Sequence, residues 1–179
     1  MICNFTTDLV FSMGERQRFD ISLLEQAIPN CVKVVKTDEI TDKSGVDYIA
    51  TLDGGAEIRI DGKARRKGAV VNGCEPPLAL ELWSVCPENG NGGKPGWTCS
   101  RSTEVDMILY TFDPDECKKF YLIPFQHLRM AFQRNYKTWR TKWQPRKQNN
   151  GAYKSEAMFV PANIVLDAVK EQMFGAIKG

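Results

Sequence analysis

Residues 45–65 read GVDYIATLDGGAEIRIDGKAR and predict two β-strands joined by a tight turn. The first arm, residues 48–52, is mostly apolar. Asp53-Gly54-Gly55 is typical of a turn, because glycine tolerates positive φ and aspartate bonds its own backbone. From Ala56 onward apolar and charged residues alternate, so the second strand has one apolar face and one charged face.

This alternation places three charged side chains close together. Asp61 and Lys63 are two residues apart on one strand, so they point the same way, and Asp47 opens the neighbouring strand. Two converging carboxylates make the hard oxygen site that Mg²⁺ prefers, and a lysine beside it can orient a water or steady negative charge. The alternative is an ordinary half-exposed hairpin whose charged face is solvated.

Asp47, followed by Asp61-Gly62-Lys63 after a hairpin, resembles the signature of the PD-(D/E)XK, or restriction-endonuclease-like, nuclease superfamily. The resemblance covers roughly residues 25–81. The sequences LELWS at 80–84, GW at 96–97 and DMILY at 106–110 are also similar to small phage or mobile-element members. The resemblance to this superfamily implies a phosphodiesterase of the endo- or exodeoxyribonuclease type that depends on Mg²⁺ or Mn²⁺.

The resemblance also implies a role for each residue of the motif. Asp47 and Asp61 would bind the metal, the Gly62 carbonyl would be a further ligand, and Lys63 would assist the attacking water. A carboxylate on an upstream helix often completes the set. Glu25 is our candidate for it, and Glu15 is the rival; either could equally be a solvated helix residue.

Glu81 is a lone carboxylate in an otherwise apolar run, residues 78–85. Such a group is costly to bury unless it is paired or bound to a metal. We therefore expect Glu81 to be a further ligand or the partner of Lys63 or an arginine. An edge strand with Glu81 in water is the alternative.

Cations are concentrated in two segments, although the net charge is only +2. Between His127 and Lys147 the chain has no acidic residue, and aromatic residues at helical spacing predict a core-facing stripe with the cations outside. A single-sign face predicts contact with a polyanion, here DNA. The predicted nucleic-acid-binding residues are Arg65, Arg66, Lys67, Arg129, Arg134, Lys137, Arg140 and Lys142.

Composition is that of an ordinary globular protein, with 42% hydrophobic and 26% charged residues in 179. No secretory signal or membrane span is apparent, so we expect no membrane partner and a cytoplasmic location, in a host cell if the chain is phage-encoded. Six cysteines lack the spacing of a zinc module, and we expect reduced, mostly structural thiols. The single histidine, His127, is expected to be structural.

Periodicity predicts the secondary structure. Strands are expected at 46–52, 56–65, 78–85, 105–112 and 120–123, a further short strand at 31–35, and helices at 15–28, 126–142 and 161–173. These predict one domain over residues 1–179 of the α/β (α+β) class, with a central mixed β-sheet flanked by helices. The resemblance implies the same core, a restriction-endonuclease-like one.

Alternatives to a DNA-cleaving enzyme stay open at this point. The chain could be a nucleic-acid-binding module without cleavage activity, or a protein that binds and modulates a host factor. A homodimer is also open, because many members of the superfamily act as dimers.

Overall fold

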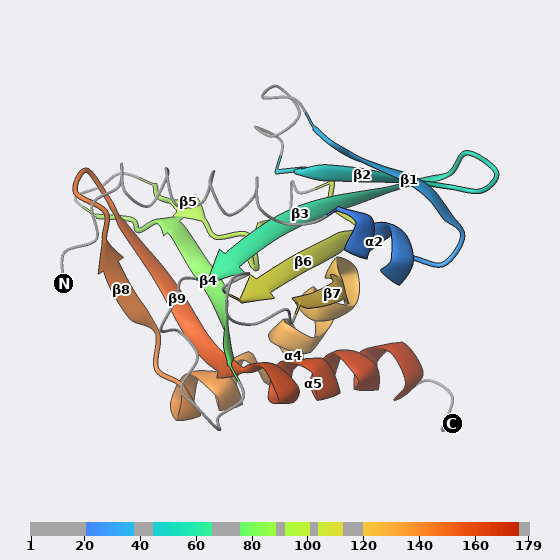
Figure 1. Ribbon diagram of the computed structural model, residues 1–179. Coiled ribbons are helices and arrows are strands. Elements are labelled where there is room, and N and C mark those ends of the chain that lie inside the picture. Colours follow the sequence, from blue (N-terminus) through green and yellow to red (C-terminus); the bar gives the residue numbers. More distant parts are fainter. Residues whose placement is uncertain are drawn as a thin grey trace. The chain divides into compact units, whose positions relative to one another are not determined.

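The computed structural model describes residues 21–37, 45–65, 76–88, 92–100, 104–112 and 120–175 (Figure 1). These residues form two compact units, each with its own β-sheet. The mixed-sheet unit comprises the described residues within Ser12–Lys67 and Ser102–Phe125. The antiparallel-sheet unit comprises those within Gly68–Arg101 and Gln126–Gly179. That all 179 residues form a single domain stays a prediction.

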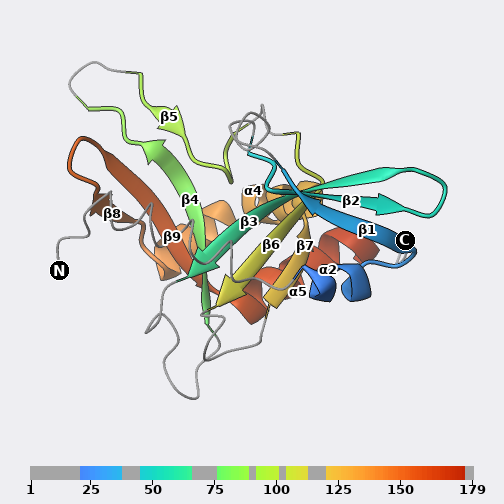
Figure 2. The same cartoon turned by 45° about the horizontal axis from the view of Figure 1, so that its top comes forward.

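A five-stranded sheet organises the mixed-sheet unit, in the order β1-β2-β3-β6-β7 (Figure 2). Its elements are α2 (Ser22–Ala27), β1 (Cys31–Lys36), β2 (Tyr48–Leu52), β3 (Glu57–Arg65), β6 (Met107–Phe112) and β7 (Phe120–Pro124). Neighbouring strands are antiparallel except β3 and β6, which are parallel. A mixed sheet in a chain that also contains helices confirms the predicted α+β class.

The hairpin β2–β3 confirms the prediction from residues 45–65. Gly54 and Gly55 have φ of 94° and 84°, which are accessible to glycine at little cost, and the Gly55 N–H donates to the Leu52 carbonyl over 2.9 Å. Tyr48 pairs with Ile60 and Thr51 with Glu57, so the strands run without a slip. This register fixes which residues of β3 face the core.

Apolar residues from α2 and four strands form the core of the mixed-sheet unit. The buried cluster contains Leu24, Ile28, Val34, Tyr48, Ala50, Ile60 and Leu109. The helix predicted at 15–28 is described only from Ile21 onward, where α2 spans Ser22–Ala27; Glu15 lies outside the described residues. The chain turns after α2 at Asn30, which has a positive φ of 59°.

A second, four-stranded sheet with the order β5-β4-β9-β8 organises the antiparallel-sheet unit. The elements are β4 (Pro77–Val85), β5 (Lys94–Pro95), α4 (Phe125–Lys142), β8 (Arg146–Asn149), β9 (Lys154–Pro161) and α5 (Ala162–Phe174), with α4 entering this unit at Gln126. The strand expected at 78–85 is present as β4. Its place in a separate sheet, and the strands β5, β8 and β9, were not predicted.

Both predicted C-terminal helices are present. Leu128, Phe132 and Trp139 are buried on α4, which confirms the core-facing stripe, and Val165 and Val169 are buried on α5. Pro161 immediately precedes α5, where its fixed φ suits a helix start. Within the described chain, no helix combines the length and the apolar character needed to cross a bilayer.

Candidate functional site

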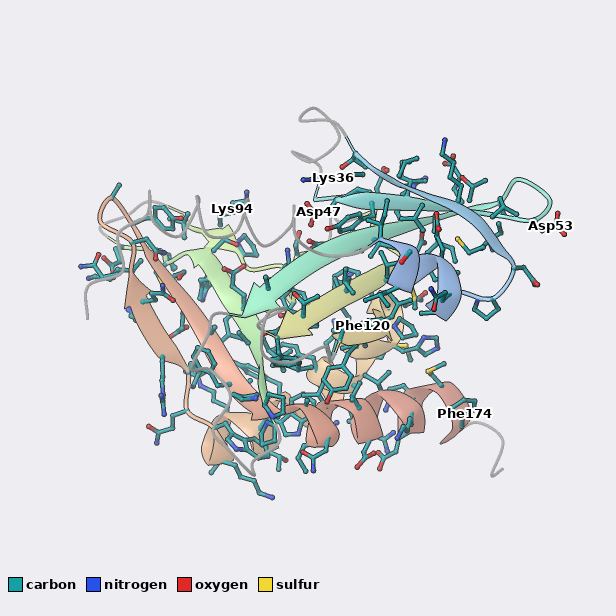
Figure 3. The ribbon with its side chains drawn as sticks, in the orientation of Figure 1. Lys36, Asp47, Asp53, Lys94, Phe120 and Phe174 are labelled. Atoms are coloured by element: carbon teal, nitrogen blue, oxygen red, sulfur yellow. The ribbon has the colours of Figure 1, made fainter. Side chains whose placement is uncertain are left out.

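Asp47 and Asp61 occupy facing positions on β2 and β3. Because Tyr48 pairs with Ile60, one step outward along the ladder brings Asp47 opposite Asp61. The Asp47 N–H donates to the Ile60 carbonyl over 2.9 Å, which ties the residue to β3 (Figure 3). Each aspartate is only 3% exposed, and in the described part of the chain no other charged side chain is buried. Burying two carboxylates is costly unless positive charge or hydrogen bonds compensate it.

The Asp47 carboxylate is held by the backbone of the motif itself. The Gly62 N–H donates to Asp47 Oδ2 over 2.6 Å, a short charge-assisted bond. A Cβ at Gly62 would lie 3.1 Å from the same oxygen and 3.4 Å from Tyr48 Cε2, closer than most side-chain contacts allow. Glycine at this position therefore lets the backbone approach the carboxylate.

The Asp61 carboxylate is paired with the amine predicted to accompany it. Lys63 Nζ lies 2.6 Å from Asp61 Oδ1, and the Lys63 side chain is 27% exposed. The amine therefore lies against the carboxylate at the edge of the buried site. Alternation along β3 puts both side chains on one face, as the sequence predicted.

Thr37 supports the strand entry that carries Asp47, and sequence reasoning missed it. Its N–H donates to the Asp47 carbonyl over 2.9 Å, and its Oγ1 donates to the Val46 carbonyl over 2.5 Å. Thr37 follows β1 at the start of a segment that reads as a polar loop, so no pattern marked it. Its two bonds fix the backbone from which the Asp47 side chain projects.

Glu25 makes a structural hydrogen bond between two elements of the mixed-sheet unit. The Val34 N–H donates to Glu25 Oε1 over 3.0 Å, which ties α2 to β1. This bond accounts for one carboxylate oxygen without any metal. The role of Glu25 as the helix carboxylate of the site stays a prediction.

Glu81 lies on β4 and is half-buried in the antiparallel-sheet unit. Ser84 Oγ donates to its Oε2 over 2.7 Å, and the Trp97 N–H donates to the same oxygen over 3.3 Å. Two neutral donors thus bind one oxygen of the carboxylate, and the expected pairing with Lys63 or an arginine stays a prediction. Its role as a metal ligand stays a prediction.

The predicted nucleic-acid-binding cations divide between described and undescribed residues. Arg66 and Lys67 lie outside the described residues, and the side chain of Arg65 is likewise not described. Arg134, Lys137, Arg140 and Lys142 are exposed on α4, whereas Arg129 is half-buried. Of the predicted cations whose side chains are described, the outer four are exposed along one helix.

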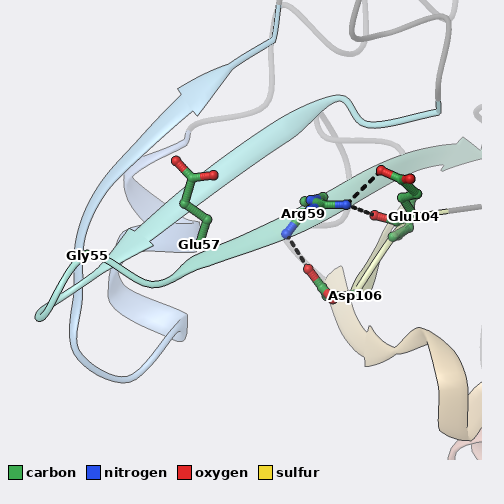
Figure 4. Close-up of a pocket in the computed structure, with 6 residues that line it drawn as sticks. Gly55, Glu57, Arg59, Glu104 and Asp106 are labelled. Carbon is green, nitrogen blue, oxygen red and sulfur yellow. Dashed lines mark hydrogen bonds and ion pairs between the residues drawn. The ribbon is translucent and has the colours of Figure 1, made fainter.

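A polar pocket of about 700 Å³ opens beside the first part of β3 (Figure 4). It is lined by Gly55, Glu57, Arg59, Glu104, Val105 and Asp106. Arg59 Nη1 lies 2.8 Å from Glu104 Oε2, and the Arg59 N–H donates to Asp106 Oδ2 over 2.8 Å. These contacts join β3 to the segment that leads into β6. The charged residues that line the pocket therefore have a structural role in holding these two segments together.

The described residues contain no cluster of three or more histidine, cysteine, aspartate or glutamate side chains suited to a metal ion. Cys31, Cys86 and Cys99 are free thiols, as expected, while Cys3, Cys74 and Cys117 lie outside the described residues.

No protein-family model, curated protein or solved structure matches the chain. The chemistry of the site must therefore be argued from its own residues. These are two buried carboxylates on adjacent strands, a lysine amine bonded to one of them, and a backbone amide bonded to the other.

Proposed function

We propose that the chain is a Mg²⁺- or Mn²⁺-dependent phosphodiesterase that hydrolyses DNA, with its site at Asp47, Asp61 and Lys63. The observation that carries the proposal is the burial of both aspartates with the Lys63 amine 2.6 Å from Asp61. On a charged hairpin face without a function, these carboxylates would stay in water and would pay no desolvation cost.

The charges of the site fit a divalent cation. The site brings together two carboxylates that are each only 3% exposed, with the Lys63 amine against one of them. Magnesium in proteins is commonly held by one or two carboxylates, with waters and substrate phosphates filling the other positions. Asp47 and Asp61 would hold the ion, and the Gly62 carbonyl as a further ligand stays part of the proposal.

Each residue of the chain has a distinct task in this scheme. When bound, the cation supplies Lewis-acid activation of water and phosphate. The Gly62 amide keeps Asp47 in one orientation, and Thr37 fixes the backbone beneath it. The Lys63 ammonium group, held at Asp61, can donate to a phosphate oxygen and offset the negative charge that develops there.

The proposal is tested with the purified protein of residues 1–179, radiolabelled DNA in single-stranded and duplex forms, and Mg²⁺ or Mn²⁺. Asp61→Asn keeps the shape of the side chain and removes its charge, and Lys63→Met removes the amine. Both should abolish cleavage, while Lys36→Met, an exposed lysine on β1, should leave it unchanged. Cleavage that persists in both site variants would contradict the assignment.

Metal binding gives a second and independent measurement. Isothermal titration with Mn²⁺ should show one site in the unmodified protein and a loss of affinity in Asp47→Asn and Asp61→Asn. Circular dichroism checks that both variants fold. A protein that binds DNA but neither binds the metal nor cleaves would favour the alternative, a nucleic-acid-binding module without cleavage activity.

A further inference from the structure

The exposed charged side chains of α4 are all positive. Its sequence, FQHLRMAFQRNYKTWRTK, contains no aspartate or glutamate. We call Arg134, Lys137, Arg140 and Lys142, which are all exposed, the α4 cationic face. Leu128, Phe132 and Trp139 of the same helix are buried, so the packing of these residues holds the helix that carries the charges in place.

The described carboxylates do not pair with the cations of this face. In the described part of the chain, Arg134, Lys137 and Lys142 have no ion pair or side-chain hydrogen bond. Lysines elsewhere in the same unit do have carboxylate partners: Lys154 lies 3.2 Å from Glu88, and Lys170 lies 3.4 Å from Asp167. The antiparallel-sheet unit thus supplies acids to some surface lysines but not to those of α4.

Arg140 is oriented by a neutral group. Its Nη1 donates to the Tyr136 hydroxyl over 2.9 Å, and its guanidinium carbon lies 5.8 Å from the centre of the Tyr136 ring. The contact restricts the side chain and leaves its full charge and its other N–H groups available. A guanidinium fixed in this way is suited to paired hydrogen bonds with a phosphate.

Helix stability does not account for the whole face. Arg140 and Lys142 lie in the last turn, where cations interact favourably with the helix dipole. Arg134 and Lys137 lie outside that turn, and the three-residue steps from Arg134 to Lys137 to Arg140 bring like charges together, which destabilises a helix. Arg134 and Lys137 therefore point to a polyanionic ligand.

We infer that the α4 cationic face binds the sugar-phosphate backbone of DNA without regard to sequence. That DNA is the polymer rests on the proposed function; the face itself is argued from its own charges. Lysine and arginine contacts to phosphates supply sequence-independent affinity and release counterions from the DNA. The antiparallel-sheet unit thus contributes DNA affinity, and the mixed-sheet unit contributes the chemistry.

The test measures DNA binding by fluorescence anisotropy over a series of KCl concentrations. EDTA is present, so no metal-dependent step takes part. Replacing Arg134 and Lys137 together by glutamine, a good helix former, should weaken binding of a labelled duplex roughly tenfold. The slope of log K against log salt, which is negative, should become less steep by about 2. Circular dichroism should show an unchanged helix content.

A matched control removes two cations from the same unit that already have carboxylate partners. Lys154→Gln combined with Lys170→Gln changes the net charge equally and should leave affinity and salt slope close to those of the unmodified protein. Equal losses in both double variants, or none in the α4 variant, would overturn the inference. Because the assay excludes metal, its result does not depend on whether the aspartate site hydrolyses DNA.

Discussion

Lys63 Nζ lies 2.6 Å from Asp61 Oδ1, two residues earlier on the same face of β3. The Asp61 side chain is 5% exposed and that of Lys63 is 27% exposed, so the carboxylate is buried and the amine reaches it from the edge of the site. The pair is therefore both the compensation for a buried charge and the centre of the proposed chemistry. Its contribution to stability can be separated from its contribution to activity.

Removing the amine should destabilise the protein because it leaves a buried carboxylate without its charged partner. We expect Lys63→Met to lower the free energy of unfolding by about 1–3 kcal/mol, measured in urea without divalent metal. Asp61→Asn in the same background should recover part of that loss, because the uncompensated charge is then gone. Additive effects of the two substitutions would mean that the pair is not coupled in solution.

A methyl group at Gly62 should disturb Asp47 specifically. Its Cβ would lie 3.1 Å from Asp47 Oδ2, so the carboxylate or the strand must move. We expect Gly62→Ala to cost about 1 kcal/mol of stability and to weaken Mn²⁺ binding. Gly175→Ala is the control, because Gly175 has a helical φ of −64° and no atom within 4 Å of the added group. Its stability and metal affinity should not fall.

The sequence predicted the β2–β3 hairpin of the mixed sheet because this hairpin carries strong local signals. Turn glycines and strict alternation fixed the β2–β3 register, and this register brings Asp47 opposite Asp61. The hairpin β8–β9 was missed for the opposite reason. All four residues of β8, Arg146–Asn149, are polar and exposed, so no apolar alternation marks this edge strand.

The supporting contacts of the site could not be predicted from local patterns. Thr37 reaches the Val46–Asp47 backbone through tertiary structure, and Glu25 meets the Val34 amide across the α2–β1 connection. For Glu81 we weighed a charged partner or a metal against water. A hydroxyl and a backbone amide were not among those alternatives, and Trp97, which supplies the amide, is distant in sequence.

Gly96 should tolerate substitution much less well than Gly62. A Cβ at Gly96 would overlap the backbone oxygen of Glu81 and lie 2.7 Å from its Cγ. The clash is with the backbone of β4, which cannot rotate away as a side chain can. We expect Gly96→Ala to cost about 3 kcal/mol, at the upper end for overpacking. Urea denaturation compares the two alanine variants; a loss at Gly96 no larger than at Gly62 would contradict this packing.

The thiol of Cys99 should react slowly at neutral pH. Desolvation by the surrounding protein raises its pKa above the ordinary value; the positive charge of Arg129 opposes this shift, and the negative charge of Glu81 adds to it. Only the thiolate is nucleophilic, so a raised pKa lowers the reactive fraction at any pH below it. The rate of iodoacetamide labelling, followed by mass spectrometry, should rise at higher pH than for Cys99 in urea-denatured protein.

Two substitutions test the causes of the Cys99 shift. Arg129→Gln removes a charge that lowers this pKa, so the labelling curve should move to still higher pH. Glu81→Gln removes a charge that raises it, so the curve should move to lower pH. The labelling curves of the two variants should shift in opposite directions along the pH axis. A shift in the same direction would mean that Arg129 and Glu81 do not have opposite effects on the pKa of the Cys99 thiol.

Thr37 offers a way to change the orientation of Asp47 without touching any carboxylate. Thr37→Val keeps the size of the side chain and the N–H bond to the Asp47 carbonyl, but removes the Oγ1 bond to the Val46 carbonyl. We expect a loss of about 1 kcal/mol in stability, because a half-buried carbonyl loses its donor. Thr37→Ser keeps the hydroxyl and should restore most of that loss.

Any effect of Thr37 on the proposed metal ion should follow from the same bond. If the Val46–Asp47 backbone positions the carboxylate, Thr37→Val should weaken Mn²⁺ binding several-fold in isothermal titration, as loss of a supporting group does at other metal sites. Thr37→Ser should bind almost as well as the unmodified protein. Equal Mn²⁺ affinity in the valine and serine variants would leave Thr37 a purely structural residue, since only a positioning role requires the hydroxyl to influence the ion.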